Sequence, residues 1–97
     1  MNISNLFVFE FYSKKINFNI FKLIINKIQS TCNNNIIILI IDSNLKLSSE
    51  ILDLFDKVYI SNKKNKLFSI IDKIPFVYDR LVHIIYPNKI NINNILN

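Results

Sequence analysis

Asp42 is the residue whose type and position come closest to those of a catalytic group. It directly follows the apolar run 36–41, and the end of a buried strand carries catalytic side chains in many α/β enzymes. A carboxylate at such a break also caps turns, because its oxygens can accept backbone N–H groups two residues on. We interpret Asp42 as a turn or cap carboxylate.

Two further side chains could carry chemistry, His83 and Cys32. His83 has no cysteine, histidine or carboxylate at ligand spacing, which makes metal binding improbable. Asp79 lies four residues earlier on the same strand face, too far to form a dyad with His83. Cys32 has no base near it in the sequence, and we interpret it as a small apolar filler. We therefore expect no catalytic residue and no metal site.

The chain contains no glycine. The phosphate-binding P-loop, the dinucleotide-binding GxGxxG turn and the nucleophile elbow all need glycine for backbone reasons that no other residue meets. None of the three can be present in standard form. We expect a protein that is not an enzyme and has no cofactor.

The basic residues indicate a polyanionic partner. Twelve lysines and arginines stand against seven acidic residues, for a net charge of +5. Such side chains neutralise RNA phosphates without reading sequence. The alternative is that they are ordinary solvated residues. The candidate RNA contacts are Lys14, Lys15, Lys63, Lys64, Lys66, Arg80 and Lys89. Tyrosines 12, 59, 78 and 86 could stack on bases, although aromatic residues in strands more often pack in a core or an interface.

The composition also indicates the source genome. Alanine and tryptophan are absent as well as glycine, whereas Ile (21), Asn (16) and Lys (11) make up 48 of the 97 residues. Selection on a fold does not remove glycine and alanine together, since both are common in ordinary domains. The missing types have G+C-rich codons and the abundant ones A+T-rich codons. We infer an extremely A+T-rich genome, such as that of an organelle or of a reduced parasite or symbiont.

The elements that would position these residues fit one small domain. Residues 6–12 alternate three phenylalanines, a period typical of a strand. Polar residues at spacings of three and four then predict a helix over 14–31 that Ser13 could cap, and Asn33–Asn35 form a turn. We further expect a buried strand at 36–41, a short helix over 50–56 capped by Ser48 or Ser49, strands at 57–61 and 77–86, and a helical stretch from Pro87.

Two segments between these elements are less regular. Residues 62–66 hold three lysines and no apolar anchor, so we expect this basic loop to be ordered only against RNA. Residues 67–74 favour neither helix nor strand, and Pro75 ends them.

The stretch Arg80–Lys89, RLVHIIYPNK, followed by Ile92 and Ile95, resembles the most recognisable segment of ribosomal protein ten of the small subunit, the family that includes the antitermination protein NusE. That family has an Arg-Leu-Val/Ile-Asp strand running into a helix opened by proline. The pair Lys14 and Lys15, placed between a strand and a long helix, also matches. The sequence departs from the family at His83, at the run 36–41 and after residue 97, where the family continues into a fourth strand.

The resemblance implies an α+β fold. We expect a ferredoxin-like antiparallel sheet with two helices on one face, in a single domain over 1–97. Residues 43–76 would form an extended excursion between the second and third core strands. Because the fourth strand is missing, the edge Leu6–Tyr12 would be unpaired, and an exposed edge of this kind needs cover. We therefore expect another chain, or an RNA segment, to cover it.

The resemblance also implies a function, that of a structural constituent in the head of the small ribosomal subunit. Its partners would be small-subunit ribosomal RNA and the neighbouring small-subunit proteins three, nine and fourteen. No small-molecule substrate is implied, and the longest apolar run is too short to span a membrane. The composition places such a protein in the mitochondrial matrix as an organelle-encoded chain, or else in a plastid or the cytoplasm of an A+T-rich symbiont.

Two alternatives remain open. The chain could be a protein-interaction subunit of a different, non-ribosomal organelle assembly, since a high apolar content suits any buried subunit. It could also be a small βαβ phospho-acceptor or enzyme domain that uses Asp42.

Overall fold

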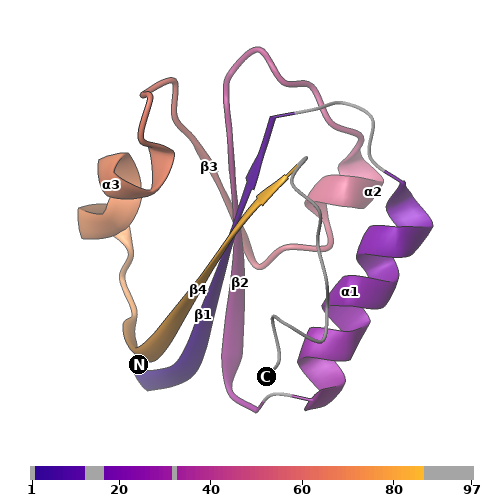
Figure 1. The fold of residues 1–97 in the computed structure, drawn as a ribbon, viewed down its shortest axis with the longest axis vertical. Helices are drawn as coiled ribbons and strands as arrows, with labels where there is room; N and C mark the ends of the chain where they lie inside the picture. The colour runs from indigo at the N-terminus through magenta and orange to yellow at the C-terminus, as the bar shows by residue number, and fades with distance from the viewer. Residues whose placement is uncertain (1, 13–16, 32, 87–97) are drawn as a thin grey trace.

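The computed structural model describes residues 2–12, 17–31 and 33–86, in which strands and helices alternate (Figure 1). In chain order the elements are β1 (Asn2–Phe11), α1 (Phe18–Thr31), β2 (Asn35–Ile41), α2 (Ser49–Leu52), β3 (Lys57–Ile60), α3 (Lys66–Ile70), the 3-10 turn η1 (Ile71–Lys73) and β4 (Val77–Tyr86).

All four strands run parallel, in the order β3-β2-β1-β4. The prediction of an antiparallel, ferredoxin-like sheet is therefore wrong. A helical segment follows each of the first three strands, and a crossover of this kind returns the chain to the end of the sheet where the previous strand began. The apolar runs 6–9 and 36–41 also indicate a parallel sheet, because parallel strands buried on both faces are almost continuously apolar.

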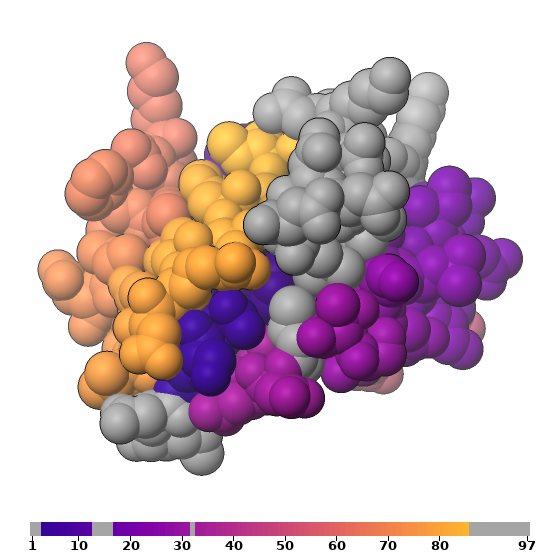
Figure 2. Space-filling model, turned by 60° about the horizontal axis from the view of Figure 1, so that its bottom comes forward, coloured from indigo at the N-terminus to yellow at the C-terminus, as the bar shows by residue number. Residues whose placement is uncertain are grey.

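Strand β1 lies in the middle of the sheet. It pairs with β2 on one side and with β4 on the other. Figure 2, which looks towards the starting ends of the strands, shows indigo β1 enclosed between orange β4 and magenta β2. The predicted unpaired edge at Leu6–Tyr12 is thus wrong, and β1 needs no outside strand to cover it. Within the described residues, β3 and β4 are the edge strands.

The sheet has four strands because the segment 43–76 contributes one of them. We expected this segment to be an excursion outside the core strands. It holds α2, β3, α3 and η1, and β3 pairs with β2 from Ile38↔Lys57 to Ile41↔Ile60. The strand that we predicted at 57–61 is thus an integral member of the sheet.

Helices α1 and α2 cover one face of the sheet (Figure 1). The three alternating phenylalanines of β1 point to this face, as their period predicted. Phe9 and Phe11 pack against Phe21 and Phe55 with ring centroids 4.8 to 6.4 Å apart. Several of these pairs meet edge to face, an arrangement that aromatic rings favour.

Helix α3 covers the opposite face. Ile70 from α3 packs there with Leu6 and Val8 of β1 and with Ile38 and Ile40 of β2. This helix lies over β1 and β2, whereas His83 and Ile85 of β4 on the same face are exposed. The part of this face above the carboxyl end of β4 is therefore open among the described residues.

Local signals placed most elements correctly. Helix α1 ends at Thr31 as predicted, but it begins at Phe18. Asn17 Oδ1 accepts a hydrogen bond from the Ile20 amide at 3.2 Å and so caps the helix. Asn34 takes the left-handed conformation expected of the turn, with φ 58°. Ser48 Oγ caps α2. The predicted cap Ser13, Cys32 and the predicted helical stretch from Pro87 lie outside the described residues.

Candidate functional site

The strand order reverses direction between β1 and β4. The chain moves from β1 outward to β2 and β3, and then crosses the α3 face to β4 on the far side of β1. In open parallel sheets, ligands bind outside the carboxyl ends of the strands at such a reversal. The side chains at this edge are Glu10 from β1, Tyr12 after β1, Asp42 after β2, Ser61 after β3, and His83 and Ile85 from β4.

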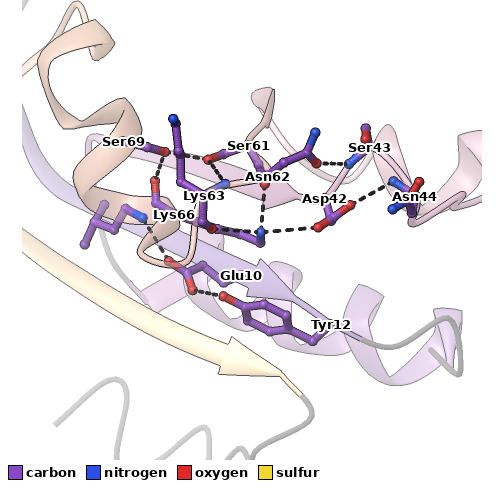
Figure 3. A network of polar contacts seen from close by, with 11 residues as sticks. Glu10, Tyr12, Asp42, Ser43, Asn44, Ser61, Asn62, Lys63, Lys66 and Ser69 are labelled. Carbon is purple, nitrogen blue, oxygen red and sulfur yellow. Dashed lines mark hydrogen bonds and ion pairs between the residues drawn. The ribbon is translucent and has the colours of Figure 1, made fainter.

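Glu10 is the central ionisable group of this edge. It is only 3% exposed, and its carboxylate accepts a hydrogen bond from Tyr12 Oη at 2.8 Å and another from the Leu67 amide at 3.1 Å (Figure 3). His83 Nε2 lies 3.0 Å from Glu10 Oε1. A buried carboxylate is costly unless it is paired and hydrogen-bonded, and these three partners meet that requirement.

Tyr12 is held in its protonated form. The pKa of the Tyr12 phenol is raised to about 12, first by partial burial and then by its hydrogen bond to Glu10 and by the negative charges of Glu10 and Asp42. The hydroxyl therefore remains a hydrogen-bond donor to Glu10 at neutral pH. The ring itself stays available, because the residue is 48% exposed.

Lys66, at the start of α3, is buried and faces the interior of this edge. Its Nζ donates to the Ser61 carbonyl at 2.7 Å and to the Lys63 carbonyl at 3.4 Å. It also lies 3.7 Å from Asp42 Oδ2 and 5.4 Å from the centroid of the Tyr12 ring. One ammonium group thus joins the ends of β2 and β3, the loop between β3 and α3, and Tyr12 (Figure 3).

Short polar contacts fix the loops around Lys66. The hydroxyls of Ser61 and Ser69 lie 2.6 Å apart, and Ser61 Oγ accepts the Lys63 amide at 3.3 Å. Asn62 Oδ1 accepts the Ser43 amide at 2.9 Å, which ties the loop after β3 to the loop after β2. Asp42 Oδ1 accepts the Asn44 amide at 2.9 Å, which confirms Asp42 as a turn carboxylate.

Two hollows flank Tyr12 at this edge. The larger, of about 420 Å³, lies on the α3 side and is lined by Glu10, Tyr12, Lys64, Asn65, His83 and Ile85. The smaller, of about 260 Å³, is lined by Phe11, Tyr12, Asp42, Asn44 and Leu45. Tyr12 lines both hollows, and the larger one holds a histidine, a lysine and the Glu10 carboxylate, whereas the smaller one holds the Asp42 carboxylate.

The structure divides the seven residues that we predicted as RNA contacts. Lys63 and Lys64 are exposed in the loop at the carboxyl edge, whereas Lys66 is buried and paired. Arg80 is exposed on β4 opposite Asn5, about 20 Å along the strand from Tyr86 at ~3.3 Å per residue. The remaining three, Lys14, Lys15 and Lys89, lie outside the described residues.

Sequence reasoning missed the pairing of Glu10 with His83. The carboxylate nearest to His83 along the sequence is Asp79, four residues earlier. The β1–β4 register instead sets Val8 beside His83 and Glu10 beside Ile85. One signal was present. Each of the two residues is a lone ionisable group in an otherwise apolar run of a strand, and such groups are tolerated when they partner each other.

The described residues include no group of three or more histidine, cysteine or acidic side chains that could hold a metal ion. In the same part of the chain, no helix has the length and apolar character to cross a membrane. Comparisons with protein-family models, curated proteins and solved structures found no match for the chain.

Proposed function

We propose that the protein is a structural, non-catalytic RNA-binding subunit that contacts RNA phosphates through the carboxyl edge of its sheet. The observation that carries the proposal is the position of Lys63 and Lys64. Both are exposed, and they lie in the loop at the edge where parallel sheets bind their ligands. Each cation that neutralises a phosphate releases a condensed counterion, and this release drives RNA binding.

The loop that carries these lysines is anchored from within. The Ser61 hydroxyl accepts the Lys63 amide, the Lys63 carbonyl accepts the Lys66 ammonium, and Asn65 caps α3 through the Phe68 amide. Lys66 thus gives the loop an internal anchor that the sequence seemed to lack; that the loop is ordered only against RNA remains a prediction. A loop already in place loses less conformational entropy on binding.

The assembly that we propose is the small ribosomal subunit of a mitochondrion. The partners would be its ribosomal RNA and, by the same resemblance, small-subunit proteins three, nine and fourteen. This placement is supported by the stretch Arg80–Lys89 and by the A+T-rich composition. It has no support from the fold, because the antiparallel sheet that the resemblance implied is not the sheet of this chain.

The salt dependence of RNA binding tests the proposal. We expect the double variant Lys63→Ala/Lys64→Ala to reduce the slope of log K against log salt concentration by up to about two, since each phosphate contact contributes roughly 0.7 to 0.9. The matched control is Lys27→Ala/Lys57→Ala, which removes the same charge from exposed lysines away from the carboxyl edge. Equal slopes in the two variants would contradict the proposal, as would a tagged chain that sediments away from small subunits.

A second candidate function is favoured by the contact between Asp42 and Lys66. Asp42 ends a parallel strand, its side chain is 36% exposed, and the Lys66 ammonium lies 3.7 Å from Oδ2. A carboxylate in this position could attack the phosphorus of acetyl phosphate, with acetate as the leaving group. Intact-mass analysis would show a phosphoryl adduct in the native chain and none in Asp42→Asn. If neither chain gains the adduct, this candidate is ruled out.

A further inference from the structure

The larger hollow at the carboxyl edge lies at the reversal point of the sheet. It opens between β1 and β4, on the part of the α3 face that the described residues leave uncovered. Its volume of about 420 Å³ falls in the range of small-molecule clefts, roughly 300 to 1,000 Å³. Position and size together make it a candidate binding site, which we call the β1–β4 crevice.

His83 is oriented towards a ligand by Glu10. His83 Nε2 lies 3.0 Å from Glu10 Oε1 as an ion-pair contact, so Nε2 faces the carboxylate and Nδ1 is the ring atom left for a ligand. A phosphate would be bound by the imidazolium form of the ring, in which Nδ1–H is a donor. Glu10 is itself fixed by the Tyr12 hydroxyl and the Leu67 amide. A histidine oriented by a buried carboxylate needs little reorganisation when a ligand binds.

The other side chains of the crevice supply one cation and two apolar surfaces. Lys64 is exposed, and no ion pair joins it to any described residue. Tyr12 and Ile85 are 48% and 37% exposed, so both present apolar area. A ligand that satisfied this lining would combine a phosphate group with a flat ring, because aromatic side chains stack on bases and lysine binds phosphate.

We propose that the β1–β4 crevice binds a nucleotide, with the phosphate on Lys64 and His83 and the base against Tyr12. The negative charge of Glu10 does not prevent this. Its carboxylate lies behind Tyr12 and His83 and is only 3% exposed, and its oxygens are occupied by three partners. The nucleotide can be free or can be one unit of an RNA strand, and in the second case the inference rests on the proposed function.

Binding of adenosine monophosphate to the full chain, followed by NMR shifts of the Tyr12 and His83 rings, tests the crevice. We expect Lys64→Ala to weaken binding about tenfold, the usual size of one charge-assisted contact. Lys27→Ala is the matched control and leaves binding unchanged, because Lys27 is exposed on α1 and does not line the crevice. Ribose 5-phosphate, which lacks the base, should bind at least fivefold more weakly. Tyr12→Leu should abolish this difference, and Tyr12→Phe should keep it.

A tetra-adenylate separates the two sources of the nucleotide. If it displaces adenosine monophosphate and shifts the same two rings, the crevice takes a unit of RNA. If the mononucleotide binds there and the tetranucleotide does not, the ligand is a free nucleotide. The proposal is overturned if adenosine monophosphate shifts neither ring, or if it binds no better than ribose 5-phosphate. A reduced salt slope in Lys63→Ala/Lys64→Ala without these shifts would leave the RNA-binding function standing and remove the crevice alone.

Discussion

At the residue scale, the site depends on how two buried charged groups are paired. Glu10 accepts two hydrogen bonds and lies beside His83, and Lys66 donates to two carbonyls and lies beside Asp42. Burying a charged group is costly unless it is paired and hydrogen-bonded, and both groups have such partners. Among the described residues that are not exposed, no fully buried side-chain nitrogen or oxygen lacks a hydrogen-bond partner. The buried polar side chains of the carboxyl edge are therefore all hydrogen-bonded, and the exposed side chains lie around them.

Tyr12 gives a pH dependence with a definite sign. Its pKa in the folded chain is about 12, above the ordinary value of 10.0. The folded state therefore holds the phenolic proton more tightly, and this contribution to stability is complete below pH 10 and is lost as the pH rises towards 12. Carbon-13 NMR of the tyrosine Cζ atoms should show one resonance that titrates last and disappears in Tyr12→Phe. Titration of that resonance near pH 10 in the folded chain would contradict the pairing with Glu10.

At the element scale, α3 is coupled to the strands through Lys66. Replacing this residue by methionine keeps most of its volume but leaves the Ser61 carbonyl without its donor. An unsatisfied buried acceptor costs about 1–3 kcal/mol, so we expect Lys66→Met to lower the free energy of unfolding by this amount in urea. The control Lys64→Met changes an exposed side chain two residues away and should stay within about 0.5 kcal/mol. Equal losses in the two variants would mean that Lys66 does not anchor the loop.

The elements themselves were largely predictable from the sequence. Strand β4 covers the predicted residues 77–86, and the predicted strand at 36–41 falls within β2. A period of two residues in a strand, or of three to four in a helix, sets which side chains share a face. The local pattern of apolar residues therefore predicts which face of each element is buried. The start of α1 was misplaced, because Asn17 was not considered as its cap.

At the scale of the whole molecule, the direction of the strands is the feature that local patterns did not predict. The period of a strand is the same whether its neighbour runs parallel or antiparallel, so the direction depends on where each crossover returns the chain. The continuous apolar runs of β1 and β2 favoured a parallel sheet, but the likeness of Arg80–Lys89 to an antiparallel family outweighed them. The contact between Glu10 and His83 depends on the register of β1 against β4. These two strands are far apart in the sequence, so no local pattern predicts their register.

The direction of the strands also gathers the proposed contacts at one edge. Parallel strands place Glu10, Asp42, Ser61 and His83 towards the same end of the sheet, with the loop of Lys63 and Lys64 among them. An antiparallel sheet would have sent neighbouring strand ends to opposite edges. The central claim is thus that the carboxyl edge, and no other surface of the described residues, meets RNA.

Lysine acetylation of the chain within its native particle, read by mass spectrometry before and after nuclease treatment, tests this claim most directly. We expect Lys63 and Lys64 to be protected at least tenfold while RNA is present and to become reactive once it is digested. Lys27 and Lys57, which are exposed away from the carboxyl edge, should react equally in both states. Protection of Lys27 and Lys57 with full reactivity of Lys63 and Lys64 would contradict the account.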